Sequence, residues 1–313
     1  MPQENKIANG YVLGVDGGGS KTIAALADLK GNILKTSRGS SCHPRNFGLK
    51  VAVNNLCQTI FKVLPKKGKI YSSFLGLPAM EEEFKFKKEI IKKEILKHQE
   101  VSPIFGSKML IGSDQLVGFR TGTNQKEGVM LNAGSGSVCH GWTKGKEVKT
   151  CGWGYLSETG SGFFIGQRGF QALWKELDGR GPKTLITKLI FQKTRAKTKE
   201  DLIFEVYSQN PAKIITSFST LVGQAAQKKD RVARKILTEI GQELVLSAQT
   251  VIKKLDFSKK EFPLVFIGSV FDSKFLLSFV KKEIKKVAPK AQFIRSKTEL
   301  VVGAVRLALE NGD

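Results

Sequence analysis

Residues 17–19 are three consecutive glycines between two apolar runs, and this arrangement constrains the fold more than any other feature of the chain. The first run, residues 11–15, ends in Asp16, and the second, residues 23–26, follows the polar residues 20–22 directly. The pattern predicts a strand, a tight turn and a returning strand. Because glycine has no side chain, the backbone N–H groups of such a turn can approach a bulky anion such as a nucleotide phosphate.

Polar side chains around this turn suit a phosphate and a metal ion. Asp16, at the end of the strand, is placed to hold Mg²⁺ through water, while Ser20, Lys21 and Thr22 offer two hydroxyls and a cation to phosphate oxygens. A plain hairpin is the alternative, but it usually needs one glycine and has no use for the adjacent acid. A P-loop and a dinucleotide fingerprint both lead into a helix, so neither fits.

A second segment repeats the pattern. Residues 128–133 form an apolar run that enters Gly134-Ser135-Gly136-Ser137, and a further apolar run begins at residue 138. Each returning strand then reaches a Lys-Gly pair, at residues 30–31 in the first copy and at residues 144–145 in the second. One supersecondary unit used twice explains both copies. Taken alone, Gly-Ser-Gly-Ser also describes a linker, but between apolar strands it predicts a second phosphate turn.

Strands alternate with helices in each half of the chain, which predicts an α/β protein of two domains with the ligand cleft between them. The first domain is expected at residues 1–123 and the second at residues 124–313, with a helical insertion at about 161–256. The final helix is expected either in the second domain or packed back on the first. Strands are expected at about 11–16, 23–28, 33–37, 69–76, 108–112, 264–267 and 292–295, and helices at about 47–64, 81–97, 228–256, 272–286 and 298–310.

The chain of 313 residues carries a formal net charge of +23. Such a charge can indicate a nucleic-acid or membrane partner. The excess is mostly lysine, spread thinly over the polar faces of predicted helices without a stripe of stacking aromatics, so nucleic-acid binding is not expected. No apolar run approaches the roughly 20 residues of a membrane span, and residues 1–10 are polar, so neither a membrane contact nor a leader is expected.

The cysteines and histidines limit the chemistry further. Cys42, Cys57, Cys139 and Cys151 have irregular spacings and no Cys-x-x-Cys, which indicates free thiols in a reducing cytoplasm. The three histidines form no metal-ligand pair, so Mg²⁺ at Asp16 is the only metal expected.

Asp114 is the candidate catalytic base. It directly follows residues 109–113, which are predicted to form a buried strand, and precedes a short predicted helix. In an α/β sheet, an acid at the carboxyl end of a strand lies at the mouth of the ligand cleft. The alternative is that Asp114 is the N-cap of the following helix, a position that favours aspartate.

Residues 16–22 resemble the first phosphate motif of the actin-like, Hsp70-like and sugar-kinase ATPase superfamily. Within it, the chain is similar to the BadF/BadG-type ATPase family, which includes N-acetylglucosamine kinases. Residues 134–137 resemble the second phosphate motif of that family, residues 152–166 the segment that follows, and residues 264–271 its adenosine motif. The resemblance implies two ribonuclease H-like (actin-like ATPase) domains with a nucleotide cleft between them.

The resemblance also implies ATP and Mg²⁺ as cofactors, an amino sugar such as N-acetylglucosamine as substrate, and a homodimer. It implies that Asp114 accepts the proton of a sugar hydroxyl and that Asp114, Ser135 and Glu158 bind the sugar. Residues 156–161 depart from the family pattern by one missing residue, and Glu158 stands where the family has an aspartate. The nucleotide-binding residues implied are Asp16, Gly17, Gly18, Gly19, Ser20, Lys21, Thr22, Gly134, Ser135, Gly136, Ser137, Gly268 and Ser269, with Asp16 also at the metal.

Two other functions remain open from the sequence. An activator ATPase of the 2-hydroxyacyl-CoA dehydratase and benzoyl-CoA reductase type would need cysteines that hold an iron–sulfur cluster at a dimer interface, and the four cysteines do not show that pattern. A nucleotide-binding sensor without catalysis is consistent with the altered residues 157–159. The related repressor and kinase family usually carries a zinc-binding cysteine cluster, which is missing from this sequence.

Overall fold

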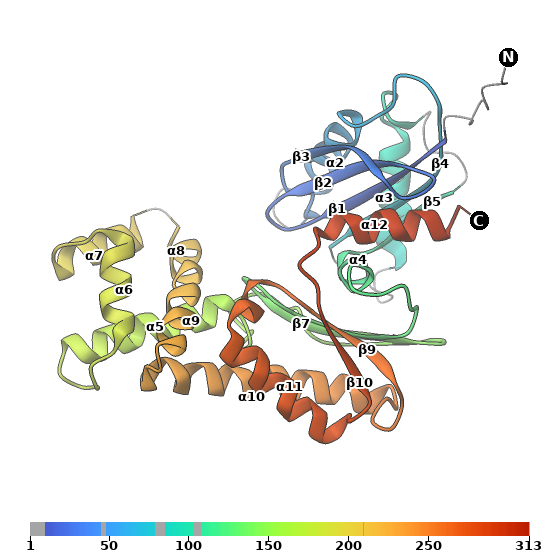
Figure 1. Ribbon diagram of the computed structural model, residues 1–313. Helices are drawn as coiled ribbons and strands as arrows, with labels where there is room; N and C mark the ends of the chain where they lie inside the picture. Colours follow the sequence, from blue (N-terminus) through green and yellow to red (C-terminus); the bar gives the residue numbers. More distant parts are fainter. Residues whose placement is uncertain (1–9, 45–47, 79–84, 103–107, 209, 313) are drawn as a thin grey trace, which may run out of the picture. The chain divides into compact units, whose positions relative to one another are not determined.

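The computed structural model describes residues 10–44, 48–78, 85–102, 108–208 and 210–312. The chain forms two compact units, each built on one five-stranded mixed sheet (Figure 1). Unit 1 comprises Met1–Gln125 and Lys297–Asp313, and unit 2 comprises Lys126–Ser296. The last residues of the chain, from Lys297, belong to unit 1. Two helices were expected to begin at residue 47 and at residue 81. Residue 47 and residues 81–84 lie outside the described residues.

The sheet of unit 1 has the strand order β3-β2-β1-β4-β5. Strands β1, β2 and β3 pair antiparallel, whereas β4 pairs parallel with β1 and β5 parallel with β4. The carboxyl ends of β1, β4 and β5 therefore meet at one edge of the sheet. The bounds are β1 Gly10–Gly17, β2 Thr22–Asp28, β3 Ile33–Gly39, β4 Lys69–Leu77 and β5 Met109–Ser113.

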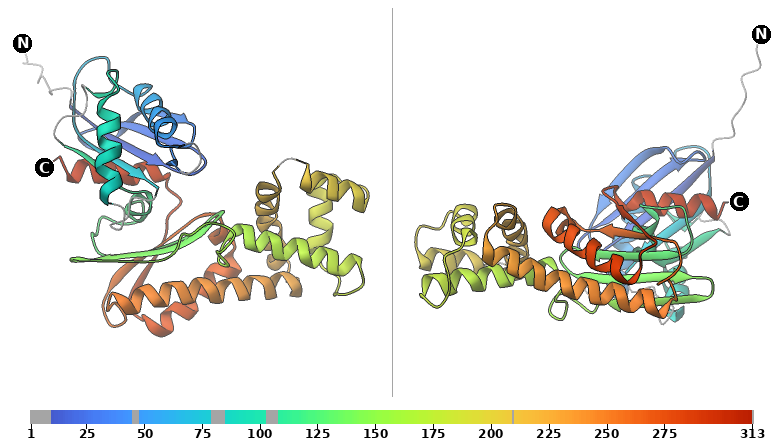
Figure 2. Two further views of the ribbon diagram at one scale, coloured as in Figure 1. Left: turned by 180° about the vertical axis from the view of Figure 1, so that it is seen from behind. Right: turned by 60° about the horizontal axis from the view of Figure 1, so that its bottom comes forward.

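Helices cover both faces of this sheet (Figures 1 and 2). Leu13 and Val15 pack with α2 and α3 on one face, and Val12 packs with α4 and α12 on the other. Since successive strand residues point to opposite faces, β1 is apolar at nearly every position. Helix α12 lies so close that a Cβ on Gly14 would be 2.5 Å from the backbone nitrogen of Val305. The bounds are α2 Leu49–Phe61, α3 Lys85–Leu96, α4 Asp114–Arg120 and α12 Leu300–Glu310.

Unit 2 repeats the topology of unit 1. Its strand order is β10-β9-β6-β7-β8, with β6, β7 and β8 antiparallel and β9 and β10 added parallel to β6. The prediction of one strand–turn–strand unit used twice is therefore confirmed as two copies of one sheet topology. The bounds are β6 Gly128–Ala133, β7 Ser137–Thr143, β8 Lys146–Cys151, β9 Phe262–Ile267 and β10 Ala291–Arg295.

The helical part of unit 2 follows β8 and extends beyond its sheet (Figure 2). Helix α10 runs from this helical part along β7 and β8 and also packs against α11. Its buried residues Ile236, Ile240 and Leu244 have the helical spacing that the sequence predicted. The bounds are α5 Gly162–Leu177, α6 Leu185–Thr194, α7 Lys199–Tyr207, α8 Pro211–Ser217, α9 Ser219–Gln227, α10 Arg231–Lys254, the 3₁₀ helix η3 Ser269–Asp272 and α11 Lys274–Val287.

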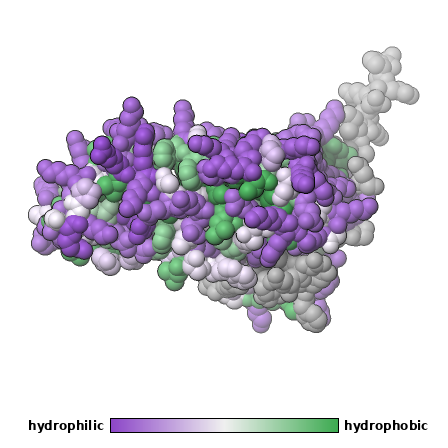
Figure 3. Space-filling view, turned by 90° about the horizontal axis from the view of Figure 1, so that it is seen from below, coloured by the Kyte–Doolittle hydropathy of each residue, from purple (hydrophilic) through white to green (hydrophobic). Residues whose placement is uncertain are grey.

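Lysines lie on the outer faces of amphipathic helices. In α11, Leu276, Val280 and Ile284 are buried, while Lys282 and Lys285 are exposed. The face drawn in Figure 3 is mostly hydrophilic, and its hydrophobic residues form small separate groups. Within the described ranges, no helix combines the length and apolar character needed to span a bilayer.

Candidate active site

The first glycine-rich turn joins β1 to β2 in unit 1. Strand β1 ends at Gly17 and β2 begins at Thr22. The N–H of Gly18 donates to the carbonyl of Lys21 over 2.9 Å, which closes the turn. Gly19 and the neighbouring Ser20 are exposed at its tip. The residues predicted to bind phosphate in this unit therefore lie together in one tight turn.

The glycines of this turn have different roles. A Cβ on Gly17 would lie 2.5 Å from Cys42 Sγ and 2.8 Å from Leu77 Cδ2, so close packing requires glycine there. A Cβ on Gly19 would meet nothing closer than His43 Cδ2 at 3.8 Å. Gly17 thus serves the core, while Gly19 leaves the outer side of the turn open.

Side-chain hydrogen bonds connect this turn to the segment that follows β3. Ser41 Oγ donates to the carbonyl of Gly18 over 3.0 Å, and Asn55 Nδ2 donates to the carbonyl of Ser41 over 2.9 Å. Thr22 is fully buried, and its hydroxyl donates to the Ser40 carbonyl over 2.7 Å. This contact gives Thr22 a structural role, and a phosphate contact from Thr22 stays a prediction. Sequence reasoning missed Ser41 and Asn55, whose partners are distant in the chain.

Asp16 lies near the end of β1 and is only 7% exposed. Burial raises the pKa of its carboxyl to about 6; the charge of Lys21 lowers this pKa, and Glu299 raises it. Glu299 is the N-cap residue of α12 and was not singled out from the sequence. Carboxylate oxygens are the protein ligands that Mg²⁺ prefers, often completed by substrate phosphates and water. Asp16 fits such a site, and the part of the chain that the structure describes holds no cluster of three or more potential metal ligands.

Asp114 is the first residue of α4 and directly follows β5. Because β1, β4 and β5 run parallel, Asp16 and Asp114 lie at the same edge of the sheet. The N-cap of α4 is Ser113, whose hydroxyl accepts a hydrogen bond from the N–H of Leu116 over 3.1 Å. The alternative that Asp114 is the helix cap is therefore removed.

Cys42 is buried at this edge as well. Burial raises the pKa of its thiol to about 11, and the carboxylates of Asp114 and Asp16 act in the same direction. The thiol is therefore protonated near neutral pH and lacks the thiolate that nucleophilic chemistry needs.

The second glycine-rich turn joins β6 to β7 in unit 2. The N–H of Gly134 donates to the carbonyl of Gly136 over 2.8 Å across the turn. At the start of α5, the N–H of Gly162 donates to the Gly134 carbonyl over 2.7 Å, and the N–H of Gly152 donates to the Ser137 carbonyl over 3.1 Å. Two neighbouring segments thus fix the turn from outside.

Glu158 also holds this turn. Its side chain is buried, with Oε2 accepting from the N–H of Ser137 over 2.6 Å and Oε1 accepting from the N–H of Gly154 over 2.8 Å. The hydrogen bonds of the described residues leave the N–H groups of Ser135 and Gly136 without a protein acceptor. Sequence analysis assigned Glu158 to sugar binding, and that contact stays a prediction.

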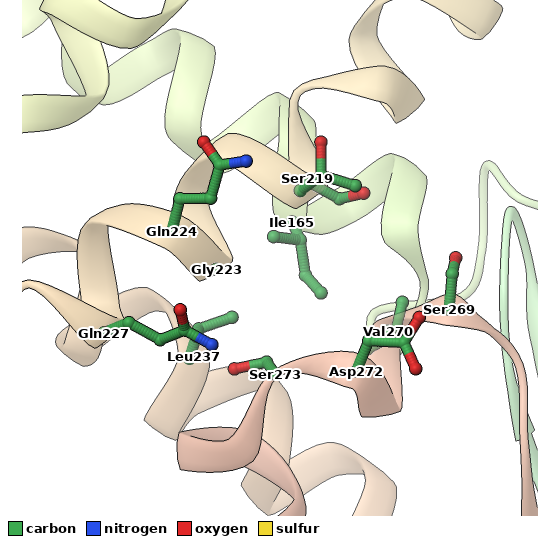
Figure 4. A pocket seen from close by; sticks show the side chains of 11 residues that line it. Ile165, Ser219, Gly223, Gln224, Gln227, Leu237, Ser269, Val270, Asp272 and Ser273 are labelled. Carbon is green, nitrogen blue, oxygen red and sulfur yellow. The ribbon is translucent and has the colours of Figure 1, made fainter.

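A cavity of about 210 Å³ opens in unit 2 where β9 ends (Figure 4). Ile165 and Leu237 contribute apolar side chains to its lining. The side chains of Gln224 and Gln227 reach it from α9, and hydroxyl and carboxylate groups reach it from residues 269–273. The lining residues are Ile165, Ser219, Thr220, Gly223, Gln224, Gln227, Leu237, Ser269, Val270, Asp272 and Ser273.

The predicted adenosine motif lies at this cavity. Gly268 has φ +93°, and a Cβ there would lie 2.2 Å from the carbonyl oxygen of Ala133, so only glycine fits. Ser269 follows it, begins η3 and lines the cavity. Arg295 Nη2 donates over 2.8 Å both to the Gly268 carbonyl and to Asp272 Oδ1. Neither Arg295 nor the α9 glutamines carried a sequence signal, because they lie in ordinary amphipathic elements.

Comparison with known proteins agrees with the motifs. The model of the BadF/BadG/BcrA/BcrD ATPase family matches residues 13–308. The chain belongs to this family. The resemblance inferred from the glycine-rich turns and the adenosine motif is therefore confirmed.

Two curated relatives are each 30% identical to this chain. One is an N-acetylmuramic acid/N-acetylglucosamine kinase of Clostridium acetobutylicum, with 97% of this chain and 99% of the relative covered. The other is an N-acetyl-D-glucosamine kinase of Dictyostelium discoideum, with 96% and 98% covered. A solved structure from Chromobacterium violaceum, named as a candidate N-acetylglucosamine kinase, has a TM-score of 0.71 at 19% identity and covers 96% of this chain and 98% of its own. At that identity it supports the fold, two actin-like ATPase units.

The different roles of Gly17 and Gly19 can be separated by substitution. Gly17→Ala should lower the free energy of unfolding by about 1–3 kcal/mol, because the new methyl group overpacks the site against Cys42 and Leu77. Gly19→Val should change it by less than about 0.5 kcal/mol, as is usual at an open surface site. The valine should instead weaken MgATP binding about tenfold or more, because it obstructs the approach of phosphate. Urea denaturation and calorimetric titration measure the two effects, and wild-type MgATP affinity in Gly19→Val would contradict the assignment.

The raised pKa of Asp16 links stability to pH. The pKa of Asp16 is about 6 in the folded protein and lies above its ordinary value of 3.8. The stability that the protonated carboxyl supplies is therefore fully present below pH 3.8 and is lost as the pH rises through about 6. Asp16→Asn should therefore raise the free energy of unfolding at pH 7.5 by up to about 3 kcal/mol. The gain should shrink as the pH is lowered to 5, and Mg²⁺-dependent nucleotide binding should be lost. Urea denaturation at both pH values measures this; a variant less stable than wild type at pH 7.5 would refute it.

Proposed function

We propose that the chain is an ATP-dependent kinase that phosphorylates one hydroxyl of an amino sugar, N-acetylglucosamine. The observation that carries the proposal is the placement of Asp114 at the same sheet edge as Asp16, with the cap of α4 supplied by Ser113 instead. The names of the two relatives at 30% identity support the choice of sugar.

The reaction would proceed by phosphoryl transfer. The oxygen of the sugar hydroxyl bonds to the γ-phosphorus of ATP, the bond from that phosphorus to the β–γ bridging oxygen breaks, and ADP leaves. Because this transition state is loose, little proton abstraction is needed early. Asp114 would orient the hydroxyl and accept its proton late, so its carboxylate must be ionised when the sugar binds.

Each unit by itself offers groups that suit a part of MgATP. In unit 2, the cavity beside Ser269 offers apolar side chains and amide and hydroxyl partners for adenosine, and the N–H groups of Ser135 and Gly136 are available to phosphate oxygens. In unit 1, Lys21 and the open side of the turn at Gly19 suit phosphate oxygens. Mg²⁺ held through Asp16 would neutralise charge on the phosphates.

Sugar contacts are proposed for Asp114 and Ser135. The sugar contact that the family resemblance implies for Glu158 is not part of this proposal, because both of its carboxylate oxygens already accept from backbone N–H groups and its side chain is buried. A homodimer and a cytoplasmic location complete the proposal.

The burial of the cysteines weighs against the activator ATPase. Cys42, Cys57 and Cys139 are buried in the cores, and Cys151 is half-buried. An iron–sulfur cluster at a subunit interface needs thiolates at the surface, which these positions do not supply.

The direct test is ADP release by the wild type with a panel of sugars, amino sugars and muropeptide fragments. N-acetylglucosamine should stimulate ADP release and yield a phosphate monoester. Binding of MgATP without stimulation by any member of the panel would favour the sensor alternative over the kinase.

Asp114→Asn should retain MgATP binding and lose sugar-dependent turnover by about 10²–10⁴, the usual contribution of a general base. Ser113→Ala is the matched control, because it removes the helix cap and should cost about 1 kcal/mol of stability with far less effect on turnover. Steady-state kinetics and thermal unfolding separate the two effects. Turnover of Asp114→Asn within a few-fold of wild type would show that this carboxylate is not the base.

A further inference from the structure

The carboxylate of Glu158 joins two backbone segments, the second glycine-rich turn at Ser137 and the following segment at Gly154. We propose that Glu158 is the positioning residue of the second phosphate turn: it fixes the shape of residues 134–137 and connects that turn to the segment at residues 152–156. This assignment rests on the proposed function, since it takes the turn as a phosphate site.

The geometry at Glu158 is specific to a carboxylate. Oε2 accepts from Ser137 N–H over 2.6 Å and Oε1 accepts from Gly154 N–H over 2.8 Å, so each oxygen has its own donor. A carboxamide offers only one oxygen acceptor and would turn an N–H toward the second donor. The N–H of Ser137 is buried, and a buried backbone donor without an acceptor is costly, so the turn needs an acceptor oxygen at this point. An acid supplies that oxygen and a second one for the N–H of Gly154.

The neighbouring glycines fit this carboxylate. A Cβ on Gly136 would lie 2.5 Å from Glu158 Oε2, so glycine at that position lets the carboxylate reach Ser137. Gly154 has φ +117°, a conformation that side chains disfavour, and its N–H meets Oε1. The sequence Gly-Ser-Gly-Ser therefore serves an internal contact as well as an open turn.

Glu158 is itself anchored to a long helix. The carbonyl of Glu158 accepts from Ser161 Oγ over 2.7 Å, and the same hydroxyl accepts from the N–H of Phe164 over 3.2 Å as the N-cap of α5. The carboxylate is thus held by a helix of 16 residues rather than by a free loop.

Two N–H groups of the second turn remain for a phosphate oxygen. Glu158 takes the N–H of Ser137, and the turn itself takes that of Gly134, which leaves Ser135 and Gly136. Fixing both ends of the turn keeps these two N–H groups in a defined direction before ATP arrives. Such preorganised donors are most effective for developing charge, because they need no reorganisation during the reaction.

If Glu158 contacted the sugar directly, its substitution would have different effects on KM and on hydrogen exchange. Loss of a sugar contact raises the KM for the sugar and leaves the shape of the turn unchanged. Loss of a positioning contact raises the KM for ATP and exposes the amides of Ser137 and Gly154 to hydrogen exchange.

The experiment compares Glu158→Gln with Glu243→Gln. Glu243 is the matched control, since its carboxylate accepts from Thr159 Oγ1 over 3.0 Å beside the same segment but does not touch the turn. Amide hydrogen exchange, followed without ligand, should be faster by about tenfold or more at Ser137 and Gly154 in Glu158→Gln, and unchanged in Glu243→Gln. The KM for ATP should rise about tenfold or more in Glu158→Gln, with the KM for the sugar within about twofold of wild type.

Wild-type exchange at Ser137 and Gly154 in Glu158→Gln would overturn the assignment, as would a raised KM for the sugar alone. If Glu158→Gln does not fold, Gly136→Ala tests the same contact, because its methyl group displaces Oε2 and should give the same faster exchange at Ser137. The exchange measurement needs no turnover. It therefore stands if the wild type shows no sugar-dependent ADP release, in which case the proposed function fails and the positioning role is judged by exchange and by calorimetric affinity for ATP.

Discussion

A turn of glycine and serine residues cannot hold its own shape, since glycine loses more conformational entropy on folding than any other residue. Both glycine-rich turns of this chain are therefore held by hydrogen bonds from neighbouring segments. Ser41 supports the first turn at the carbonyl of Gly18, and Glu158 supports the second at the N–H of Ser137. In the second turn, these contacts fix both ends while the N–H groups of Ser135 and Gly136 keep no protein acceptor.

The two units share one sheet topology but differ in how they support their turns. Unit 1 packs its turn into the core, where Gly17 meets Cys42 and Leu77, and adds a hydroxyl brace. Unit 2 uses a buried carboxylate anchored through Ser161 to α5. The two units thus reach a similar turn by different contacts.

Local patterns in the sequence predicted the strands and turns well. The apolar run of β1, buried on both faces, and the glycines after it specify a strand that ends at a tight turn, and Asp114 after β5 specifies an acid at the sheet edge. The bracing contacts could not be predicted, because they join residues far apart in the chain. Glu158 lies 21 residues from Ser137, and Arg295 lies 27 residues from Gly268. Such pairs depend on the packing of whole elements, which leaves no periodic signal in the sequence.

The central claim is that the second turn and the cavity beside Ser269 bind one nucleotide. A crystal structure with a non-hydrolysable ATP analogue, Mg²⁺ and N-acetylglucosamine tests it most directly. The account predicts adenine in the cavity lined by Gln224 and Ser273, and phosphate oxygens accepting from the N–H groups of Ser135 and Gly136. An ordered nucleotide bound elsewhere, with the cavity empty, would contradict the account.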